Sequence, residues 1–109
     1  MELMNVNDAM ARLNNNKKLY IMLLKKFDGK SMLDDLKVKV TSGDVAASES
    51  SAHTLKGVAA NLSLMDLRAE TEAIDNRLKK GDINVDLSNL EAIMENTVAA
   101  VKVWIAENS

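Results

Sequence analysis

The sequence has no cysteine and no proline among its 109 residues. Without cysteine, disulfides, thiolate metal sites and cysteine nucleophiles are all excluded. Aromatic residues are also scarce, with one Trp, one Tyr and one Phe, whereas alanine, leucine, methionine, lysine and glutamate are plentiful. These abundant residues are good helix formers and proline is the strongest helix breaker, so the composition predicts an all-α protein.

A strong charge of one sign and a long hydrophobic run are also missing. The formal net charge is −2, which does not resemble the basic surface of a nucleic-acid-binding protein. No apolar run approaches the roughly 20 residues that span a bilayer, and the N-terminal segment lacks the pattern of a secretory signal. We expect one domain over residues 1–109, in a cytoplasmic monomer that binds neither nucleic acid nor membrane.

Polar turns divide the chain into helices with hydrophobic residues at helical spacing. The predicted helices cover residues 7–13, 17–40, 45–62, 64–80 and 87–107, and the predicted N-caps are Asn7 or Asp8, Asn16, Asp44, and Ser63 in a near capping box with Asp66. Gly29 falls where the hydrophobic residues of the second predicted helix depart from regular helical spacing, so we expect a kink or break there. Short connections favour antiparallel neighbours, which predicts an antiparallel up-and-down four-helix bundle with a short N-terminal capping helix.

The only histidine, His53, lies in the third predicted helix, in the stretch "SAHTLKGVAANLS". The predicted core stripe of that helix is Ser51, Ala52, Leu55, Val58, Ala59 and Leu62. At about 100° per residue, His53 lies roughly 150° from the centre of this stripe and faces outward. Its neighbours on the outer face are small, namely Ala46, Ser50, Gly57 and Ala60, with Glu49 and Lys56 at the margin.

This outer face is unusual because exposed helix faces normally carry long charged side chains. A glycine inside a helix costs roughly 1 kcal/mol relative to alanine, so Gly57 requires a reason. Access of a partner to the imidazole is one reason, and tolerated helix packing is another. Lys56 neighbours His53 on the helix surface and is suited to stabilise a phosphoryl group on the ring.

The ordinary alternative for a lone surface histidine is a solvated polar side chain with no function. A metal site is a weak hypothesis, because a single histidine without cysteine rarely suffices, and we predict none. The combination of His53, Lys56 and Gly57 favours an exposed nucleophile with a neighbouring cation.

The segment "AHTLKG" at residues 52–57 resembles the signature of the histidine phosphotransfer (Hpt) domain of bacterial and fungal phosphorelays. His53, Leu55, Lys56 and Gly57 match the signature at each place. The resemblance extends over about residues 7–105. It includes Leu67 and the aliphatic–acidic pair Ile74-Asp75, and it departs at Ser63, where the family commonly has glycine.

This resemblance implies a phosphocarrier rather than an enzyme. His53 would accept a phosphoryl group from the aspartyl phosphate of a response-regulator receiver domain and pass it to another receiver. Lys56 would stabilise the group, Gly57 would permit approach, and the neighbours Ala46, Glu49, Ser50 and Ala60 would dock the receiver. No cofactor is expected, because Mg²⁺ would be held by the receiver, and a hybrid sensor histidine kinase is a further candidate partner.

Three other hypotheses remain open at this stage. The chain could be a helical docking module that regulates a receiver or a kinase without being phosphorylated. It could be the phosphorylated domain of a chemotaxis-type kinase, although that class usually has a different sequence after its histidine. A hydrolytic enzyme ranks lowest, because one histidine without convergent partners is a poor catalytic site, and no Gly-rich phosphate loop is present.

Overall fold

A computed structural model of the protein describes residues 2–109, and all the regular structure in this range is helical. The helices are α1 (Val6–Arg12), α2 (Lys17–Lys26), α3 (Gly29–Ser42), α4 (Val45–Asn61), α5 (Met65–Lys79) and α6 (Ser88–Asn108). The prediction of an all-α protein is confirmed. Within the described range, no helix combines the length and the apolar character that a membrane crossing needs.

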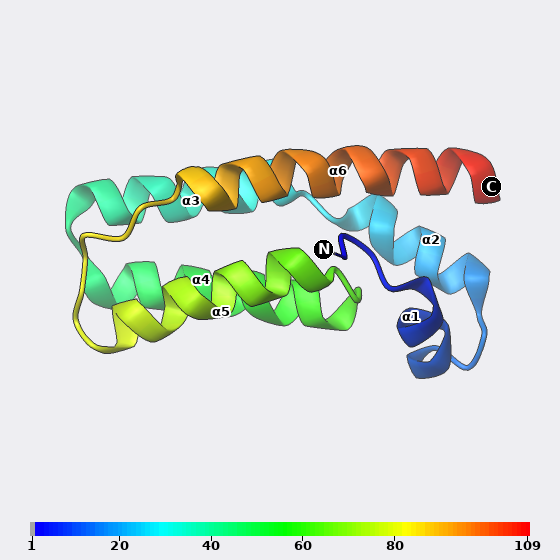
Figure 1. The fold of residues 1–109 in the computed structure, drawn as a ribbon, viewed down its shortest axis with the longest axis horizontal. Coiled ribbons are helices and arrows are strands. Elements are labelled where there is room, and N and C mark those ends of the chain that lie inside the picture. The colour runs from blue at the N-terminus through cyan, green and yellow to red at the C-terminus, as the bar shows by residue number, and fades with distance from the viewer. Residues whose placement is uncertain (1) are drawn as a thin grey trace.

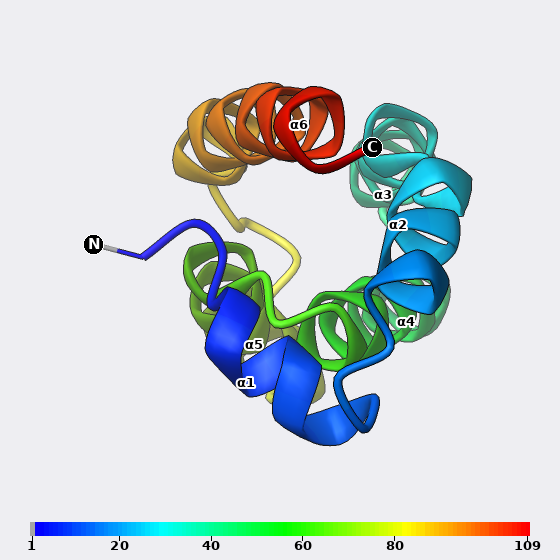
Figure 2. The same cartoon turned by 90° about the vertical axis from the view of Figure 1, so that its right-hand side faces the viewer.

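The four helices α3 to α6 lie side by side along the long axis of a molecule measuring 41 × 23 × 21 Å, and they alternate in direction (Figure 1). Each of them contacts the next, and α3 also contacts α6, which closes the ring seen end-on in Figure 2. The two shorter helices, α1 and α2, lie toward the end where α4 turns into α5. The ring encloses the hydrophobic core.

The core is built from leucine, isoleucine, valine, alanine and methionine side chains, together with Tyr20. Its fully buried large aliphatic members are Leu24, Leu36, Leu55, Leu64, Leu67, Leu78, Leu90 and Met94. On α4 the predicted stripe is buried at Ala52, Leu55, Ala59 and Leu62, whereas Ser51 and Val58 are only partly buried. One face of α4 therefore faces the core, and the opposite face remains available.

Two of the predicted helix caps are confirmed. The side chain of Asn16 accepts a hydrogen bond from the backbone N–H of Leu19 at the start of α2, and Asp44 does the same for Ala47 at the start of α4. The cap of the first helix was predicted wrongly. Asn5 caps α1, and its side chain accepts from the backbone of Asp8, so this helix begins slightly earlier than the sequence suggests.

The second predicted helix is broken, as expected near Gly29. Phe27 adopts an extended backbone, and Asp28 caps α3 by accepting a hydrogen bond from the N–H of Ser31. Gly29 is the first residue of α3 and is buried, and a Cβ there would lie 2.5 Å from the sulfur of Met94. The break thus lets the start of α3 approach α6 closely.

The predicted capping box at the start of α5 is wrong. Ser63 has a left-handed backbone with φ of 57°, and its buried hydroxyl donates a 2.6 Å hydrogen bond to the carboxylate of Asp8. Helix α5 begins after Leu64 without a side-chain cap, and the carboxylate of Asp66 accepts from the backbone N–H of Glu2 instead. The left-handed turn directs the serine away from α5 and onto α1, so it joins two elements rather than capping one.

Candidate functional site

His53 projects from the middle of α4, on the side away from the core. Its side chain is 63% exposed, which confirms the outward orientation predicted from helical spacing. Regular helical geometry places every third or fourth residue on the same face, so the neighbours of the imidazole lie one turn before and one turn after it.

Small side chains surround the imidazole on this outer face of α4. Ala46, Ser50 and Gly57 are exposed, and Ala60 is partly exposed. The structure thus brings together four residues that the sequence placed on one face. The docking role of Ala46, Ser50 and Ala60, together with Glu49, stays a prediction.

Gly57 has open space above it. A Cβ built on this residue would meet no heavy atom within 4 Å. Close packing against another element therefore does not explain the glycine. A larger side chain here would stand over the surface beside His53, and the access role of Gly57 stays a prediction.

The buried carboxylate of Asp75, on α5, lies directly behind the imidazole. Asp75 is fully buried, and its Oδ2 atom is 3.8 Å from Nδ1 of His53. The same oxygen accepts hydrogen bonds from the ammonium groups of Lys56, at 2.9 Å, and Lys79, at 3.1 Å. One carboxylate oxygen is thus shared by the imidazole and two lysines.

The two lysines keep Asp75 ionised. Burial raises the pKa of this carboxyl, but the hydrogen bonds from Lys56 and Lys79 and their positive charges outweigh burial and hold the pKa below its ordinary value. The second oxygen, Oδ1, is buried and has no hydrogen-bond partner among residues 2–109. The carboxylate is therefore held through Oδ2 alone, on the side facing His53.

Lys56 lies where the sequence placed it, one turn from His53, but its ammonium is directed at Asp75. Its side chain is 22% exposed, and its charge is matched by the carboxylate. Its predicted contact with a phosphoryl group is not tested by this arrangement.

Asp75 and Lys79 were not predicted as site residues. Asp75 was singled out only as part of an aliphatic–acidic pair near the end of its helix. A stronger signal was available, because Asp75 is in phase with the buried residues Thr71 and Leu78 of α5, and a lysine follows it four residues later. An acidic residue at a core position requires a partner, and here the partners come from α4 as well as α5.

A family model for the Hpt domain matches residues 27–104. The chain belongs to the Hpt domain family. A search of curated proteins gave no match, and a search of solved structures gave none either. The matched segment contains the complete site on α4 and α5 and leaves out α1 and α2, so it is shorter than the resemblance seen in the sequence.

Hpt domains carry phosphoryl groups in two-component signalling and interact with receiver domains. Such a role requires a nucleophilic side chain, and α4 presents an exposed histidine.

One cluster within this Hpt domain has the donor atoms of a metal site. Glu49, His53 and Asp75 each offer one ligand atom, and these atoms lie within 4.8 Å of one another. A metal ion would have to bind Oδ2 of Asp75, but the ammonium groups of Lys56 and Lys79 already pair with that oxygen. Their positive charges repel a cation at this position. The residues present do not fit a metal, and we assign none.

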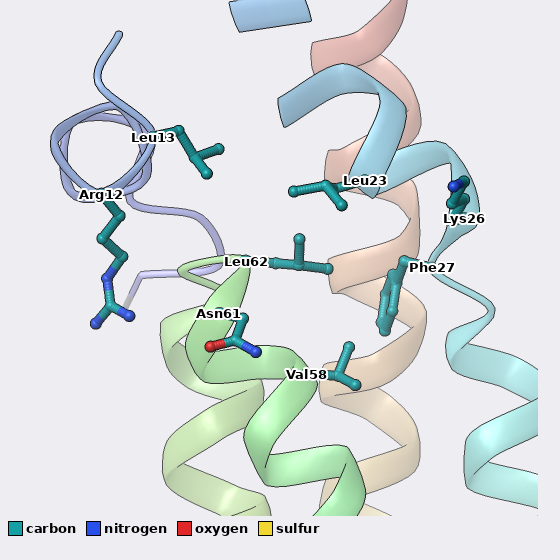
Figure 3. A pocket seen from close by; sticks show the side chains of 8 residues that line it. All are labelled: Arg12, Leu13, Leu23, Lys26, Phe27, Val58, Asn61 and Leu62. Carbon is teal, nitrogen blue, oxygen red and sulfur yellow. The ribbon is translucent and has the colours of Figure 1, made fainter. Parts of the chain in front are cut away.

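A groove of about 500 Å³ continues the open face of α4 toward α1 and α2. Figure 3 shows its lining, which is apolar at Leu13, Leu23, Phe27, Val58 and Leu62 and polar at Arg12, Lys26 and Asn61. Asn61 lies one turn beyond Gly57, which itself lies one turn beyond His53. A partner that covers the imidazole from this side would also cover the groove.

Proposed function

We propose that this Hpt domain is a phosphorelay intermediate. His53 accepts a phosphoryl group from the aspartyl phosphate of one receiver domain and transfers it to the aspartate of another. The observation that carries this proposal is the pairing of an exposed imidazole with a buried, ionised carboxylate behind it. In this proposal α3 to α6 act as the antiparallel up-and-down four-helix bundle of the family, and the N-terminal helices cap one end.

Asp75 favours one form of the imidazole. Nδ1 lies 3.8 Å from the carboxylate, and the negative charge at this distance favours a proton on that nitrogen. The lone pair is then on Nε2, which is directed at solvent and at the incoming group. The carboxylate also stabilises the positive charge that the ring acquires when Nε2 is phosphorylated.

The transfer itself is a displacement at phosphorus. Nε2 of His53 attacks, the P–O bond of the aspartyl phosphate breaks, and the receiver regains a free carboxylate. The second transfer is the reverse reaction with another receiver, so no oxidant or reductant takes part. Lys56 stabilises the charge of the phosphoryl oxygens, since its ammonium and the imidazole lie near the same oxygen of Asp75.

The partner supplies the remainder of the reaction centre. We assign this domain no cofactor and no ATP-dependent phosphorylation, and we expect Mg²⁺ on the receiver. A cytoplasmic, monomeric protein and a hybrid sensor histidine kinase as an additional partner remain expectations from the sequence.

The receiver would dock on the small-residue face of α4 and on the groove beside it. Ala46, Glu49, Ser50 and Ala60 surround the imidazole, and the groove offers an apolar floor flanked by Arg12 and Lys26. This combination suits a partner helix with an apolar ridge and acidic side chains beside it. Lys26→Glu should weaken receiver binding, measured by titration calorimetry, whereas the same reversal at Lys102, which is exposed on α6 and does not line the groove, should leave the affinity unchanged.

The central test is transfer of ³²P from a phosphorylated receiver. Label should appear on the wild-type chain, in an acid-labile form, and should be absent from His53→Gln. Thr54→Ala serves as the matched control, because Thr54 is the exposed neighbour of His53 and bonds only to the backbone of its own helix among the described contacts. Equal labelling of His53→Gln would refute the proposal, and receiver binding without any label would favour the docking module.

A further inference from the structure

We infer that Lys79 is a positioning residue that holds the buried carboxylate of Asp75, so that Lys56 is free to engage the phosphoryl group. This inference rests on the proposed phosphorylation of His53. It adds a second cation, from a different helix, to a site that the sequence assigned to α4 alone.

The geometry that supports it is the shared oxygen of Asp75. Lys56 from α4 and Lys79 from α5 both donate to Oδ2, at 2.9 and 3.1 Å. Lys79 follows Asp75 by four residues on the same helix, so its contact is local and does not depend on the distance between helices. Lys56 instead shares its helix with His53 and lies one turn from the imidazole.

The charges around the imidazole balance only when Lys79 is counted. Two carboxylates, Glu49 and Asp75, have donor atoms close to those of His53, and two ammonium groups oppose them. Without Lys79 the site would carry one excess negative charge before a phosphoryl group with a charge near −2 is added. Lys56 alone cannot neutralise both Asp75 and the phosphoryl group.

Burial explains why Asp75 cannot be left without a cation. The side chain is fully buried, and removing one partner of a buried charge pair is strongly unfavourable because the remaining charge is uncompensated. Lys56 could therefore not turn from Asp75 toward a phosphoryl oxygen if it were the only cation present. Lys79 permits that movement, and its own side chain is 47% exposed at the end of α5.

A chemical phosphoryl donor tests this without any receiver. Phosphoramidate can transfer its phosphoryl group to the imidazole: its P–N bond breaks, a bond forms between phosphorus and Nε2 of His53, and ammonia leaves. The equilibrium fraction of phosphohistidine is measured by ³¹P NMR at a fixed ratio of phosphoramidate to ammonia. The variants are Lys79→Met, Lys79→Arg and the control Lys80→Met, which removes the same charge from the adjacent exposed residue.

Lys79→Met should lower the ratio of phosphorylated to free His53 by about three- to fivefold relative to Lys80→Met, the effect of losing one partly exposed ion pair. Lys79→Arg should restore the ratio. The ³¹P resonance of the phosphoryl group should also titrate at higher pH in Lys79→Met, because a nearby cation favours the dianion and a purely structural residue would not move this titration.

A double variant separates the charge argument from a general disturbance. In Asp75→Asn/Lys79→Met the amide oxygen can still accept from Nδ1, and no buried carboxylate holds Lys56. Lys79→Met should therefore lower the phosphorylated fraction less in the Asp75→Asn background than in the wild-type chain, and in that background both proteins compared lack the Asp75 charge.

The inference is overturned if Lys79→Met and Lys80→Met give the same ratio and the same ³¹P titration, or if Lys79→Met lowers the phosphorylated fraction equally in the Asp75→Asn background. These outcomes leave the proposed relay function intact, because only the transfer of label from a phosphorylated receiver tests it.

Discussion

Substitutions at Gly57 test separately how this residue affects the stability of the protein and the access of a partner to His53. Replacement by alanine should stabilise the protein, because Gly57 lies in the interior of α4 and a Cβ there meets nothing within 4 Å. With neither a clash nor a new contact, the change in free energy of unfolding is the difference in helix propensity, about 0.8–1 kcal/mol. For a chain of this size that corresponds to a rise in melting temperature of about 4 °C.

The assay is urea and thermal unfolding followed by far-UV circular dichroism. Gly43→Ala is the matched control, because a Cβ at Gly43 also meets nothing within 4 Å but φ there is 79°. Alanine at that position should destabilise the protein by about 1–2 kcal/mol, owing to the left-handed backbone. The same substitution at two uncrowded glycines should therefore change stability in opposite directions.

The functional half of the prediction uses a larger side chain. Gly57→Leu should keep the fold and slow transfer from a phosphorylated receiver at least about tenfold, the equivalent of roughly 1.4 kcal/mol in the barrier. Labelling by phosphoramidate should persist, because that donor is small and needs no docking surface. Destabilisation by Gly57→Ala would refute the structural reasoning, and unchanged receiver transfer by Gly57→Leu would refute the access argument.

Three further predictions concern the buried polar groups. The pKa of Asp75 is lowered, because its two lysine partners outweigh burial. Its ion pairing therefore stabilises the protein above about pH 4, and this stabilisation is lost as the pH falls through the lowered pKa. Urea unfolding across acid pH should show the loss in the wild-type chain but not in Asp75→Asn. Tyr20→Phe should cost about 1–3 kcal/mol in chemical unfolding, because the Tyr20 hydroxyl donates a buried 2.7 Å hydrogen bond to the carbonyl of Leu62; a cost below about 0.5 kcal/mol would contradict this. Ser63→Gly should be about 1 kcal/mol more stable than Ser63→Ala, since both lose the hydrogen bond to Asp8 but only glycine relieves the positive φ; equal melting temperatures would count against that account.

Local features were predictable from the sequence because they depend on neighbours a few residues apart. Asn16 and Asp44 cap their helices through hydrogen bonds that span three residues. The outward position of His53 follows from the period of α4, and so does the exposure of Gly57. The family signature lies within a single helix, which is why it could be read without a structure.

The error at Ser63 arose because the partner of this residue is distant in the sequence. Ser63 looked like a cap for the following helix, but its hydroxyl bonds to Asp8, 55 residues earlier in the chain. Local cap preferences do not include such a partner, and the left-handed backbone that makes the contact possible is rare for serine. The resemblance to the family had marked this position as the departure.

The sequence by itself determined the helices, the core stripe of α4 and the histidine on its outer face, because helix periodicity is a local property of the chain. Only the tertiary structure decided what lies behind that histidine. Asp75 reaches His53 and Lys56 because α4 and α5 pack along their length, and Lys79 then meets Lys56 at the same carboxylate oxygen. A buried charge must find its partners in three dimensions, and this requirement places three cooperating side chains from two helices around one imidazole.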